Sequence, residues 1–373
     1  MKKFVQESET NVGLDCAILM NPRVWEASGH VSGFSDPLMD CKECKTRYRA
    51  DKLIEDAGFN PNGMTSEQME EFIKEKEISC PNCKAKNFTG IRKFNLMFKT
   101  FQGVTEDKKS EIFLRPETAQ GIFINFSNVQ RSMRKKVPFG IAQIGKAFRN
   151  EIVARQFIFR MREFEQMEMQ FFVRPGQELE WFKTWKEIRL KWHKALGLGD
   201  HKYRFHDHDK LAHYANAATD IEFEMPFGFK EVEGIHSRTN FDLGSHEKYS
   251  GKKLQYFDPE LNESYTPYVI ETSIGVDRMF LSIMAAAYCE EKLENGESRV
   301  VLKLPAPLAP VKLAVLPLVK KDGLPEKARE IIDTLKFDFK CQYDEKDSIG
   351  KRYRRQDAIG TPSVSYTHLT LPT

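Results

Sequence analysis

The sequence lacks long apolar stretches. No hydrophobic run approaches the roughly 18 residues that a membrane-spanning helix needs, so we expect no membrane segment. The opening residues, MKKFVQESET, are basic but lead into polar residues, and no apolar core of a signal peptide follows. A disulfide-rich secreted class is also excluded, because the 373 residues contain seven cysteines and no secretion signal. These absences indicate a cytoplasmic protein.

A strong excess of one charge is absent too. The 57 basic and 54 acidic residues leave a net charge of +3, which neither requires nor excludes a nucleic-acid partner. Such a partner would need clustered basic residues rather than a small excess of them. We find no internal repeat and no low-complexity tract. With 40% hydrophobic and 30% charged residues, the chain can bury a sizeable core, and its length predicts two or three domains.

Four of the cysteines form two pairs with the same CxxC spacing. Each pair puts two sulfurs on one turn, and two such turns can close a tetrahedron around zinc. The 35 residues between the pairs indicate an insertion between two knuckles. Four unrelated free thiols are the alternative, which identical spacing disfavours. We therefore predict a structural zinc site formed by Cys41, Cys44, Cys80 and Cys83.

The segment HDHDKLAHY is a weaker metal candidate. It contains His206, His208 and His213, but no carboxylate follows at the spacing of a zinc protease. We therefore predict no metal there.

The hydrophobic pattern predicts a mixture of strands and helices. Strand patterns cover residues 11–36, 91–173 and 202–273, with loops between the strands. Helical patterns cover residues 64–77, 178–196 and 276–291. In the first of these helices, Thr65 is a candidate N-cap with Gln68 three residues on, as in a capping box.

The proline-rich PAPLAP marks the clearest domain boundary. The β-α-β-α alternation after it predicts a small α/β domain with a mostly parallel sheet. From about Ser363 the sequence SVSYTHLTLPT shows no strand or helix pattern that continues what precedes it. We interpret these last residues as a foreign tail.

Polar residues gather where one strand pattern ends at FRNE and another returns through FEQMEMQFF. Because side chains alternate along a strand, Phe164, Gln166 and Glu168 share one face of the returning strand. Arg149 and Glu151 share a face of the outgoing strand in the same way. The two strands can thus present a guanidinium, two carboxylates and a ring to one surface. The alternative is an ordinary sheet with a solvated polar face.

A second polar constellation is ETSIGVDR. Glu271, Ser273 and Gly275 share one strand face, and Gly275 permits close backbone approach. Arg278 falls in the first turn of the helix that follows, where a cation opposes the helix dipole. Such a residue is better tolerated if it faces an anion, and a phosphate fits. RPETAQG adds another carboxylate, Glu117.

These motifs resemble those of the class II aminoacyl-tRNA synthetases. FRNE followed by REF is similar to motif 2 of that class, and GVDR before an amphipathic helix is similar to motif 3. NPRVWEASGHV resembles the end of motif 1, with Pro22 as its proline. The segments RPETAQGIF, FEQME, KEVEGIHSRTNFDL and PYVIETSIGVDR together resemble glycyl-tRNA synthetases of the homodimeric type. The resemblance runs from about Val12 to Pro362.

The resemblance implies an ATP site with two catalytic arginines. Arg149 would bind the α-phosphate while the amino acid carboxylate attacks it, and Arg278 would hold the γ-phosphate. Phe164 would stack on the purine, Glu151 would contact the adenine side, and Arg160 would assist at the triphosphate. The other positions implied for ATP are Asn150, Phe159, Arg162, Glu231, Val232 and Gly275. Catalysis would rest on positioning and electrostatic stabilisation, with Mg²⁺ offsetting the triphosphate charge.

The resemblance also implies a glycine site. Glu117, Glu168 and Glu271 would surround the ammonium group, because glycine offers no side chain to grip and larger amino acids are excluded by size. Three carboxylates in one pocket repel one another, so at least one should have a raised pKa. The alternative is that one or two of them pair with arginines such as Arg115 or Arg162 and serve only the fold. The other positions implied for the substrate are Arg49, Gln166 and Ser273.

The implied function is ATP-dependent activation of glycine to glycyl-adenylate, followed by transfer to the 3′ end of tRNA(Gly). One alternative is a class II synthetase for another small amino acid, such as serine or proline. The three glutamates and ETSIG favour glycine. Another alternative is a non-catalytic, synthetase-like tRNA-binding protein, which should have lost Arg149 or Arg278.

The implied fold is α+β, with a central antiparallel sheet flanked by helices. The expected parts are a catalytic core at 1–304 with a zinc-knuckle insertion at about 41–90, a linker at 305–310, a partial anticodon-binding α/β domain at 311–362 and the tail at 363–373. The family has sequence upstream of the position of Met1, including the motif 1 helix of the dimer interface, and it continues past Pro362. We therefore expect a fragment of a homodimeric enzyme that by itself charges tRNA poorly or not at all.

Overall fold

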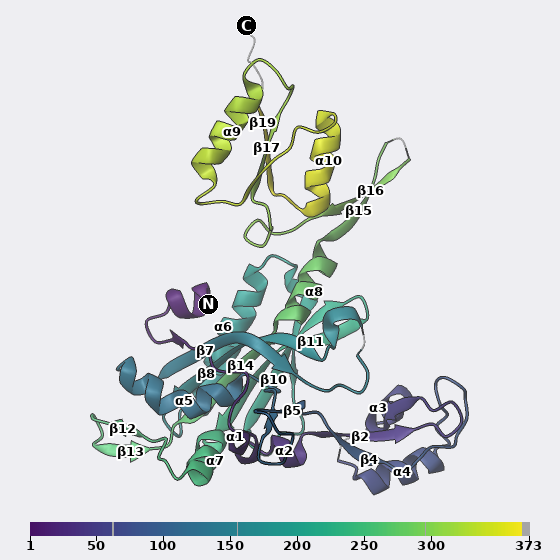
Figure 1. The fold of residues 1–373 in the computed structure, drawn as a ribbon, viewed down its shortest axis with the longest axis vertical. Coiled ribbons are helices and arrows are strands. Elements are labelled where there is room, and N and C mark those ends of the chain that lie inside the picture. The colour runs from purple at the N-terminus through teal and green to yellow at the C-terminus, as the bar shows by residue number, and fades with distance from the viewer. Residues whose placement is uncertain (62, 155, 295, 368–373) are drawn as a thin grey trace. The chain divides into compact units, whose positions relative to one another are not determined.

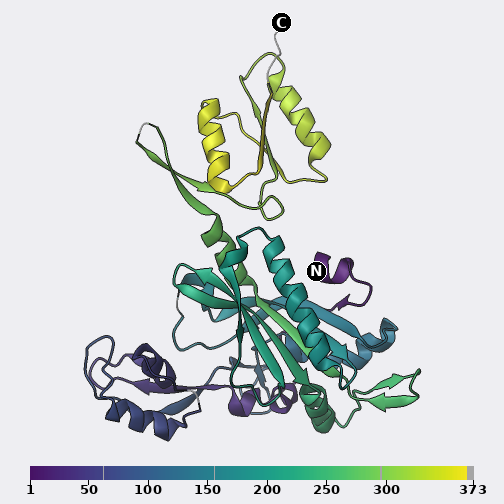
Figure 2. The ribbon, with the colours of Figure 1, turned by 180° about the vertical axis from the view of Figure 1, so that it is seen from behind.

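The computed structural model describes residues 1–61, 63–154, 156–294 and 296–367 (Figures 1 and 2). The chain divides into two compact units. The first comprises Met1–Lys186, Asp207–Asp220 and Glu233–Arg278, and the second comprises Glu187–His206, Ile221–Val232 and Met279–Thr373. No helix in the described ranges is both long and apolar enough to cross a membrane.

A seven-stranded sheet has the strand order β1-β7-β8-β14-β11-β10-β9. Its strands are β1 (Val12–Gly13), β7 (Phe139–Phe148), β8 (Glu163–Val173), β9 (Tyr203–Asp207), β10 (Ala217–Met225), β11 (Gly228–Thr239) and β14 (Tyr268–Gly275). The neighbours β7, β8, β14 and β11 are antiparallel, while β1 is parallel to β7. The expected antiparallel sheet is confirmed, and the strands of FEQMEMQFF and ETSIG are adjacent.

Two helices, α5 (Ala119–Ser132) and α7 (Phe241–Ser250), pack on this sheet in one core with Phe139 and Phe172. The ring of Phe126 lies 4.5 Å from that of Phe172, between centroids. Both helices correct the strand patterns predicted for 91–173 and 202–273. The helical period was present in the sequence, because the residues of α5 in the hydrophobic core recur at steps of three, one, three and three: Ala119, Ile122, Phe123, Phe126 and Val129.

The predicted strands of residues 11–36 are also largely wrong. After a short π-helical turn (Lys2–Gln6) and β1, the chain forms α1 (Pro22–Ala27) and α2 (His30–Gly33). The side chain of Asn21 accepts a hydrogen bond from the backbone N–H of Arg23 at 3.0 Å, and Pro22 occupies the first helical position. These local start signals outweigh the β-like apolar pattern.

The insertion builds a small sheet of its own, in the order β3-β2-β4. Its elements are β2 (Ser35–Asp40), β3 (Arg47–Arg49), α3 (Ala50–Asp56), α4 (Ser66–Glu75) and β4 (Arg92–Asn95). The predicted capping box is confirmed: Thr65 Oγ1 accepts from the Gln68 N–H at 3.3 Å, and Gln68 Oε1 accepts from the Thr65 N–H at 2.8 Å. Two short hairpins, β5 (Lys99–Phe101) with β6 (Glu111–Phe113) and β12 (Tyr256–Asp258) with β13 (Glu263–Tyr265), complete the strands of the first unit.

Two further helices match predictions from the sequence. The pattern at 178–196 forms α6 (Glu178–Ala195), and ETSIGVDR leads into α8 (Val276–Ala287). The second helix stops at Ala287 instead of continuing to 291. Residues Tyr288–Lys292 form β15 because they pair with β16 (Ser298–Leu302), a non-local contact that the helical pattern does not show.

The end of the described chain is a small α/β sheet with α9 on one side and α10 on the other (Figures 1 and 2). Its elements are β17 (Leu313–Pro317), α9 (Leu324–Leu335), β18 (Cys341–Tyr343), α10 (Ile349–Ile359) and β19 (Ser363–Thr367). The parallel pairing of β17 with β18 matches the predicted alternation, and β17 also pairs in parallel with β19, which was not predicted. The prediction that the tail has no strand character is wrong for Ser363–Thr367. The remainder of that tail lies outside the described residues.

Candidate functional site

The four paired cysteines converge in the insertion. Their sulfur atoms all lie within 4.8 Å of one another. Sγ of Cys41 is 3.5 Å from Sγ of Cys83, and Sγ of Cys44 is 3.6 Å from Sγ of Cys80. Four thiolates bound to one zinc at about 2.3 Å would have similar separations, so the donor set fits zinc. Among the described residues, three or more His, Cys, Asp or Glu side chains placed to bind one metal ion occur in this cluster.

The two knuckles have the same backbone turn. The N–H of Lys45 donates to the carbonyl of Cys41 at 3.0 Å, and the N–H of Lys84 donates to that of Cys80 at 2.8 Å. Both lysines have positive φ, 58° and 63°. The identical CxxC spacing therefore reflects identical local geometry, as the sequence predicted.

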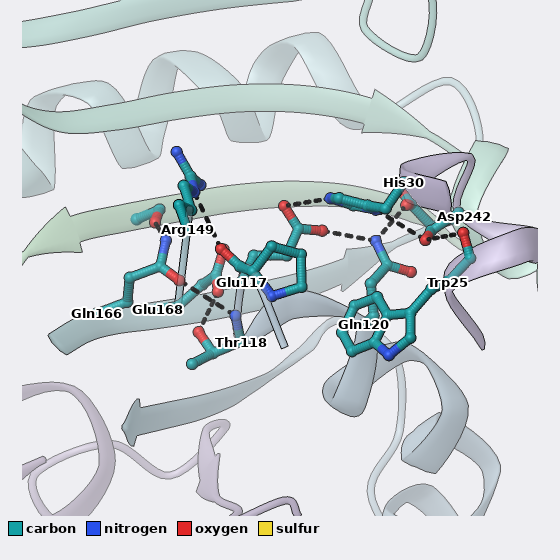
Figure 3. Close-up of polar contacts among 12 residues, drawn as sticks. Trp25, His30, Glu117, Thr118, Gln120, Arg149, Gln166, Glu168 and Asp242 are labelled. Carbon is teal, nitrogen blue, oxygen red and sulfur yellow. Dashed lines mark hydrogen bonds and ion pairs between the residues drawn. The ribbon is translucent and has the colours of Figure 1, made fainter. Parts of the chain in front are cut away.

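The glutamates predicted for the substrate come together in the first unit, where Figure 3 shows two of them, Glu117 and Glu168. Glu168 lies on β8 opposite Ser273 of β14, and Glu271 lies two residues before Ser273 on the same face. Glu117 precedes α5, and its neighbour Thr118 donates its hydroxyl hydrogen to Glu168. Each carboxylate therefore comes from a different element, although Glu117 lies in a loop instead of the strand that we expected.

Glu271 is neutralised by an arginine that the sequence analysis did not select. Nη1 of Arg238 lies 3.1 and 3.0 Å from the two carboxylate oxygens of Glu271. Gln170, the register partner of Glu271 on β8, donates from Nε2 to Oε2 of Glu271 at 2.8 Å. Arg238 also donates to both oxygens of Asp242, at 2.8 and 2.9 Å. The counter-ion of this pocket is therefore Arg238 and not Arg115 or Arg162.

The rejected candidate Arg115 has a structural role. Its guanidinium donates to the carbonyl oxygens of Lys146 and Cys16, at 2.6 and 2.8 Å. Arg162 donates through Nε to the carbonyl of Glu151 at 3.0 Å. Both arginines thus brace loops around the site.

The surroundings of the three carboxyl groups shift their pKa values in different directions. Burial raises the pKa of Glu168, and the charges of Glu271 and Glu117 raise it further, so it lies well above its usual range. Burial also raises the pKa of Glu271, but Arg238 and His236 outweigh this effect and lower it to about 2. The predicted raised pKa is therefore present, and it belongs to Glu168. In the described part of the chain, no basic side chain forms an ion pair with that carboxylate.

Glu117 is held by a short polar chain, visible in Figure 3. Nε2 of His30 lies 3.6 Å from one of its oxygens, and Gln120 Nε2 donates to the other at 2.8 Å. Gln120 also donates to Asp242 at 3.1 Å, which connects Glu117 with the partner of Arg238. Burial acts to raise the pKa of Glu117, but the charges of His30 and Arg238 hold it well below its usual range.

Arg149 follows the end of β7 and stands close to the carboxylates (Figure 3). Its Nε donates to the carbonyl of Pro116 at 3.1 Å. Its guanidinium carbon lies 5.3 Å from the ring centroids of both Phe34 and Phe164. The backbone N–H of Arg149 donates to the carbonyl oxygen of Arg162 at 2.8 Å, which joins the two ends of the loop between β7 and β8. Arg149, Phe164 and Glu168 thus share one surface, as predicted.

Arg278 begins α8 in the same unit. Its guanidinium carbon lies 4.2 Å from the ring centroid of Phe159, and its Nε donates to the carbonyl of that residue at 3.2 Å. A Cβ at Gly275 would lie 3.3 Å from Cδ of Arg278, so glycine leaves room for this side chain. Asp277 accepts a hydrogen bond from the N–H of Glu165 at 2.9 Å, which joins the start of α8 to β8.

The remaining predicted positions are more scattered. Gln166 accepts from the N–H of Thr118 at 3.2 Å and donates to Ser273 at 3.4 Å, inside the pocket. Arg49 pairs with Asp36 at 2.9 Å and with Asp51 at 2.7 Å, so carboxylates already engage it.

Five other positions predicted for ATP have these surroundings. The N–H of Asn150 donates to the carbonyl of Leu96 at 2.8 Å, and Glu151 and Arg160 lie in the loop between β7 and β8. On β11, Val232 is buried and Glu231 is exposed, and both belong to the second unit.

The sequence analysis missed His30, His236, Arg238 and Asp242. KEVEGIHSRTNFDL contains three of them, so the segment was noticed but its charges were not assigned. No helical spacing rule could have found Arg238, because it lies near the end of β11 while its partner Asp242 lies in the first turn of α7.

This sheet, with arginines at the ends of two antiparallel strands and carboxylates between them, is that of a class II tRNA synthetase core. Residues 98–287 match the family described as "tRNA synthetase class II core domain (G, H, P, S and T)". The fold is similar to that of a solved structure titled "Giardia lamblia Prolyl-tRNA synthetase in complex with prolyl-adenylate". The TM-score is 0.55 at 19% identity, over 73% of this chain and 54% of the other.

Within that class, the closer matches agree with one another. Residues 36–60 match "Glycyl-tRNA synthetase insertion domain 1". The chain is 59% identical over 369 residues to "Glycine--tRNA ligase" of Acetivibrio thermocellus, covering 97% of this chain and 79% of the relative. It is 58% identical to the protein of the same name from Geobacillus thermodenitrificans, with the same coverage. The chain belongs to the glycine–tRNA ligase family.

Proposed function

We propose that this chain carries the catalytic core of an enzyme that activates glycine with ATP to form glycyl-adenylate and transfers the glycyl group to the 3′ end of tRNA(Gly). The observation that carries the proposal is the buried carboxylate Glu168, which forms no ion pair among the described residues and lies near Glu117 and Glu271. A pocket of this kind attracts an ammonium group. Family membership supports the same activity.

The ATP side of the site would act through its two arginines. Arg149 would move from its position over Phe164 to the α-phosphate, which would free the ring for the purine, and Arg278 would meet the γ-phosphate. The arrangement works by holding the glycine carboxylate in line with the α-phosphorus and by stabilising charge as it develops there. ATP would enter with Mg²⁺ as its complexed substrate. Membership of the class supports this nucleotide, a homodimer and a cytoplasmic location.

Amino-acid-dependent ATP–pyrophosphate exchange, measured with each of the twenty amino acids, tests this function. We expect exchange with glycine and little with any other amino acid, because larger amino acids would be excluded by size. Exchange driven by serine or proline in place of glycine would contradict the assignment. No exchange with any amino acid would favour a non-catalytic tRNA-binding role.

We further propose that Cys41, Cys44, Cys80 and Cys83 bind one structural zinc ion. Cys41→Ser should lower the zinc content measured by metal analysis and should increase hydrogen exchange in residues 41–90, since a structural zinc stabilises the fold around it. Cys289→Ser is the matched control, because Cys289 lies on β15 outside the cluster. Protein purified without chelator that contained no zinc would contradict the proposal.

A further inference from the structure

A histidine on the adjacent strand faces Glu271. His236 of β11 and Glu271 of β14 are register partners in the antiparallel pair, so their side chains project from the same face. Nδ1 of His236 lies 3.2 Å from Oε1 of Glu271, and the two side chains retain 18% and 6% exposure. The function proposed above assigns no role to His236.

A second layer contacts His236. The ring of His208 lies 5.9 Å from that of His236, between centroids, with an edge-on angle of 72°. Nε2 of His208 lies 2.9 Å from Oδ2 of Asp220. His208 belongs to HDHDKLAHY, the segment in which we predict no metal. The segment therefore meets the pocket through ring and ion-pair contacts.

The backbone at Gly234 approaches the same ring closely. A Cβ on Gly234 would lie 2.8 Å from Cε1 of His236 and 3.6 Å from Oδ1 of Asp220. Any larger residue would therefore have to displace the imidazole from this position. The ring is thus confined between Gly234, His208 and Glu271.

The charges that face His236 come from three strands: Glu271 on β14, Arg238 on β11 and Asp220 on β10. Burial acts to lower the pKa of His236, but the adjacent carboxylate of Glu271 outweighs burial and raises it. The imidazole therefore carries more positive charge near neutral pH than an exposed histidine, and it favours the ionised form of Glu271.

We propose that His236 is a positioning residue of the ammonium pocket: it fixes the carboxylate of Glu271, and the His208–Asp220 pair fixes His236. The other contacts of Glu271 come from Arg238 and Gln170. Without the histidine, Glu271 would turn toward these two donors and away from the glycine ammonium. The inference rests on the proposed function, because it requires Glu271 to face glycine.

Two variants separate positioning from packing. His236→Gln retains an N–H donor toward Glu271, whereas His236→Phe fills comparable space without a donor. We expect the phenylalanine variant of the full chain to raise the glycine dissociation constant, measured by calorimetry, by about tenfold to a hundredfold. The glutamine variant should recover most of the affinity. Equal affinities in the two variants would overturn the positioning role in favour of packing.

A titration without substrate provides an independent readout. Glu271→Gln should lower the pKa of His236, because residue 271 then carries no negative charge. The pKa can be measured by NMR of the histidine ring signals as a function of pH. An unchanged titration would overturn the pairing itself. If the unaltered chain bound no glycine, the proposed function would fail and the positioning role with it. If it bound glycine and His236→Phe bound it equally well, the role of His236 alone would fail.

Discussion

Replacing Glu168 with glutamine should weaken glycine-dependent ATP–pyrophosphate exchange by about tenfold to a thousandfold, the range for the loss of one or more charged contacts. The substitution keeps the shape of the side chain and its hydrogen bond to Thr118 but removes a charge that has no ion-pair partner among the described residues. The KM for glycine should rise, while the KM for ATP should change little because the arginines proposed to bind ATP, Arg149 and Arg278, lie on other elements.

Glu163→Gln is the matched control for this experiment. Glu163 begins the same strand, β8, but its side chain is exposed and lies 3.4 Å from Lys146. It should leave the KM for glycine unchanged. If Glu168→Gln behaved like this control, the carboxylate cluster would no longer support glycine as the substrate.

The same carboxylate predicts how glycine binding depends on pH. Burial and the charges of Glu271 and Glu117 raise the pKa of Glu168 in the empty pocket, whereas an ammonium group favours its ionised form. Glycine must therefore displace a proton below that raised pKa, and its affinity should fall as pH falls. Calorimetry in buffers of different ionisation enthalpy should detect proton release on binding, and Glu168→Gln should abolish it.

The stability of the empty protein should depend on pH in the opposite sense to glycine affinity: it should be higher at lower pH. Since the pKa of Glu168 is higher in the folded than in the unfolded chain, the folded state binds more protons between these two values. The free energy of unfolding therefore falls as pH rises through that window. Glutamine does not titrate, so Glu168→Gln should raise the melting temperature of the empty protein near neutral pH and lose this advantage in acid. A lower melting temperature at neutral pH would show that the carboxylate stabilises the fold.

Removing Arg238 should have the largest effect on stability. Its guanidinium is buried between Asp242 and Glu271, and the rings of Tyr214 and Phe123 lie 4.2 and 5.6 Å from its central carbon. Arg238→Met would leave two buried carboxylates without their cation. We expect a loss of about 3–5 kcal/mol in the free energy of unfolding, measured by denaturant titration.

An exposed arginine of similar surroundings serves as the control. Arg204 lies 2.6 Å from Glu222 and 4.1 Å from the ring centroid of Phe229, but its side chain retains 53% exposure. Arg204→Met should cost only about 0–1 kcal/mol. Adding Glu271→Gln to Arg238→Met should recover part of the loss, because one unpaired charge disappears. Equal losses for Arg204→Met and Arg238→Met would contradict the importance of burial.

Sequence patterns predicted those parts of the fold whose causes are local. The capping box at Thr65 depends on residues three apart, and the cysteine cluster depends on two identical turns. The strand-loop-strand around FRNE was also predicted, because alternation along a strand is a short-range signal. In contrast, α5 was interpreted as strands because its phenylalanines and isoleucines favour both structures.

The charge partners in the pocket could not be predicted in this way. Arg238 and Glu271 are separated by 33 positions and meet because β11 and β14 are adjacent. His30 and Glu117 meet across 87 positions, the difference between their numbers, through a helix that the sequence analysis interpreted as a strand. An error in one element therefore removed a partner of the predicted site. Glutamates were found because they belong to recognisable motifs, whereas their counter-ions depended on tertiary structure.

The positions of Arg149 and Arg278 in the empty protein affect the conformational entropy lost when a nucleotide binds. Each guanidinium lies against an aromatic ring while its Nε donates to a backbone carbonyl, that of Pro116 or Phe159. Ordering a long side chain on binding costs about 0.5–1.5 kcal/mol. In this protein both side chains lose most of that freedom when the chain folds. Nucleotide binding should therefore carry a smaller entropic cost than binding to two solvated arginines.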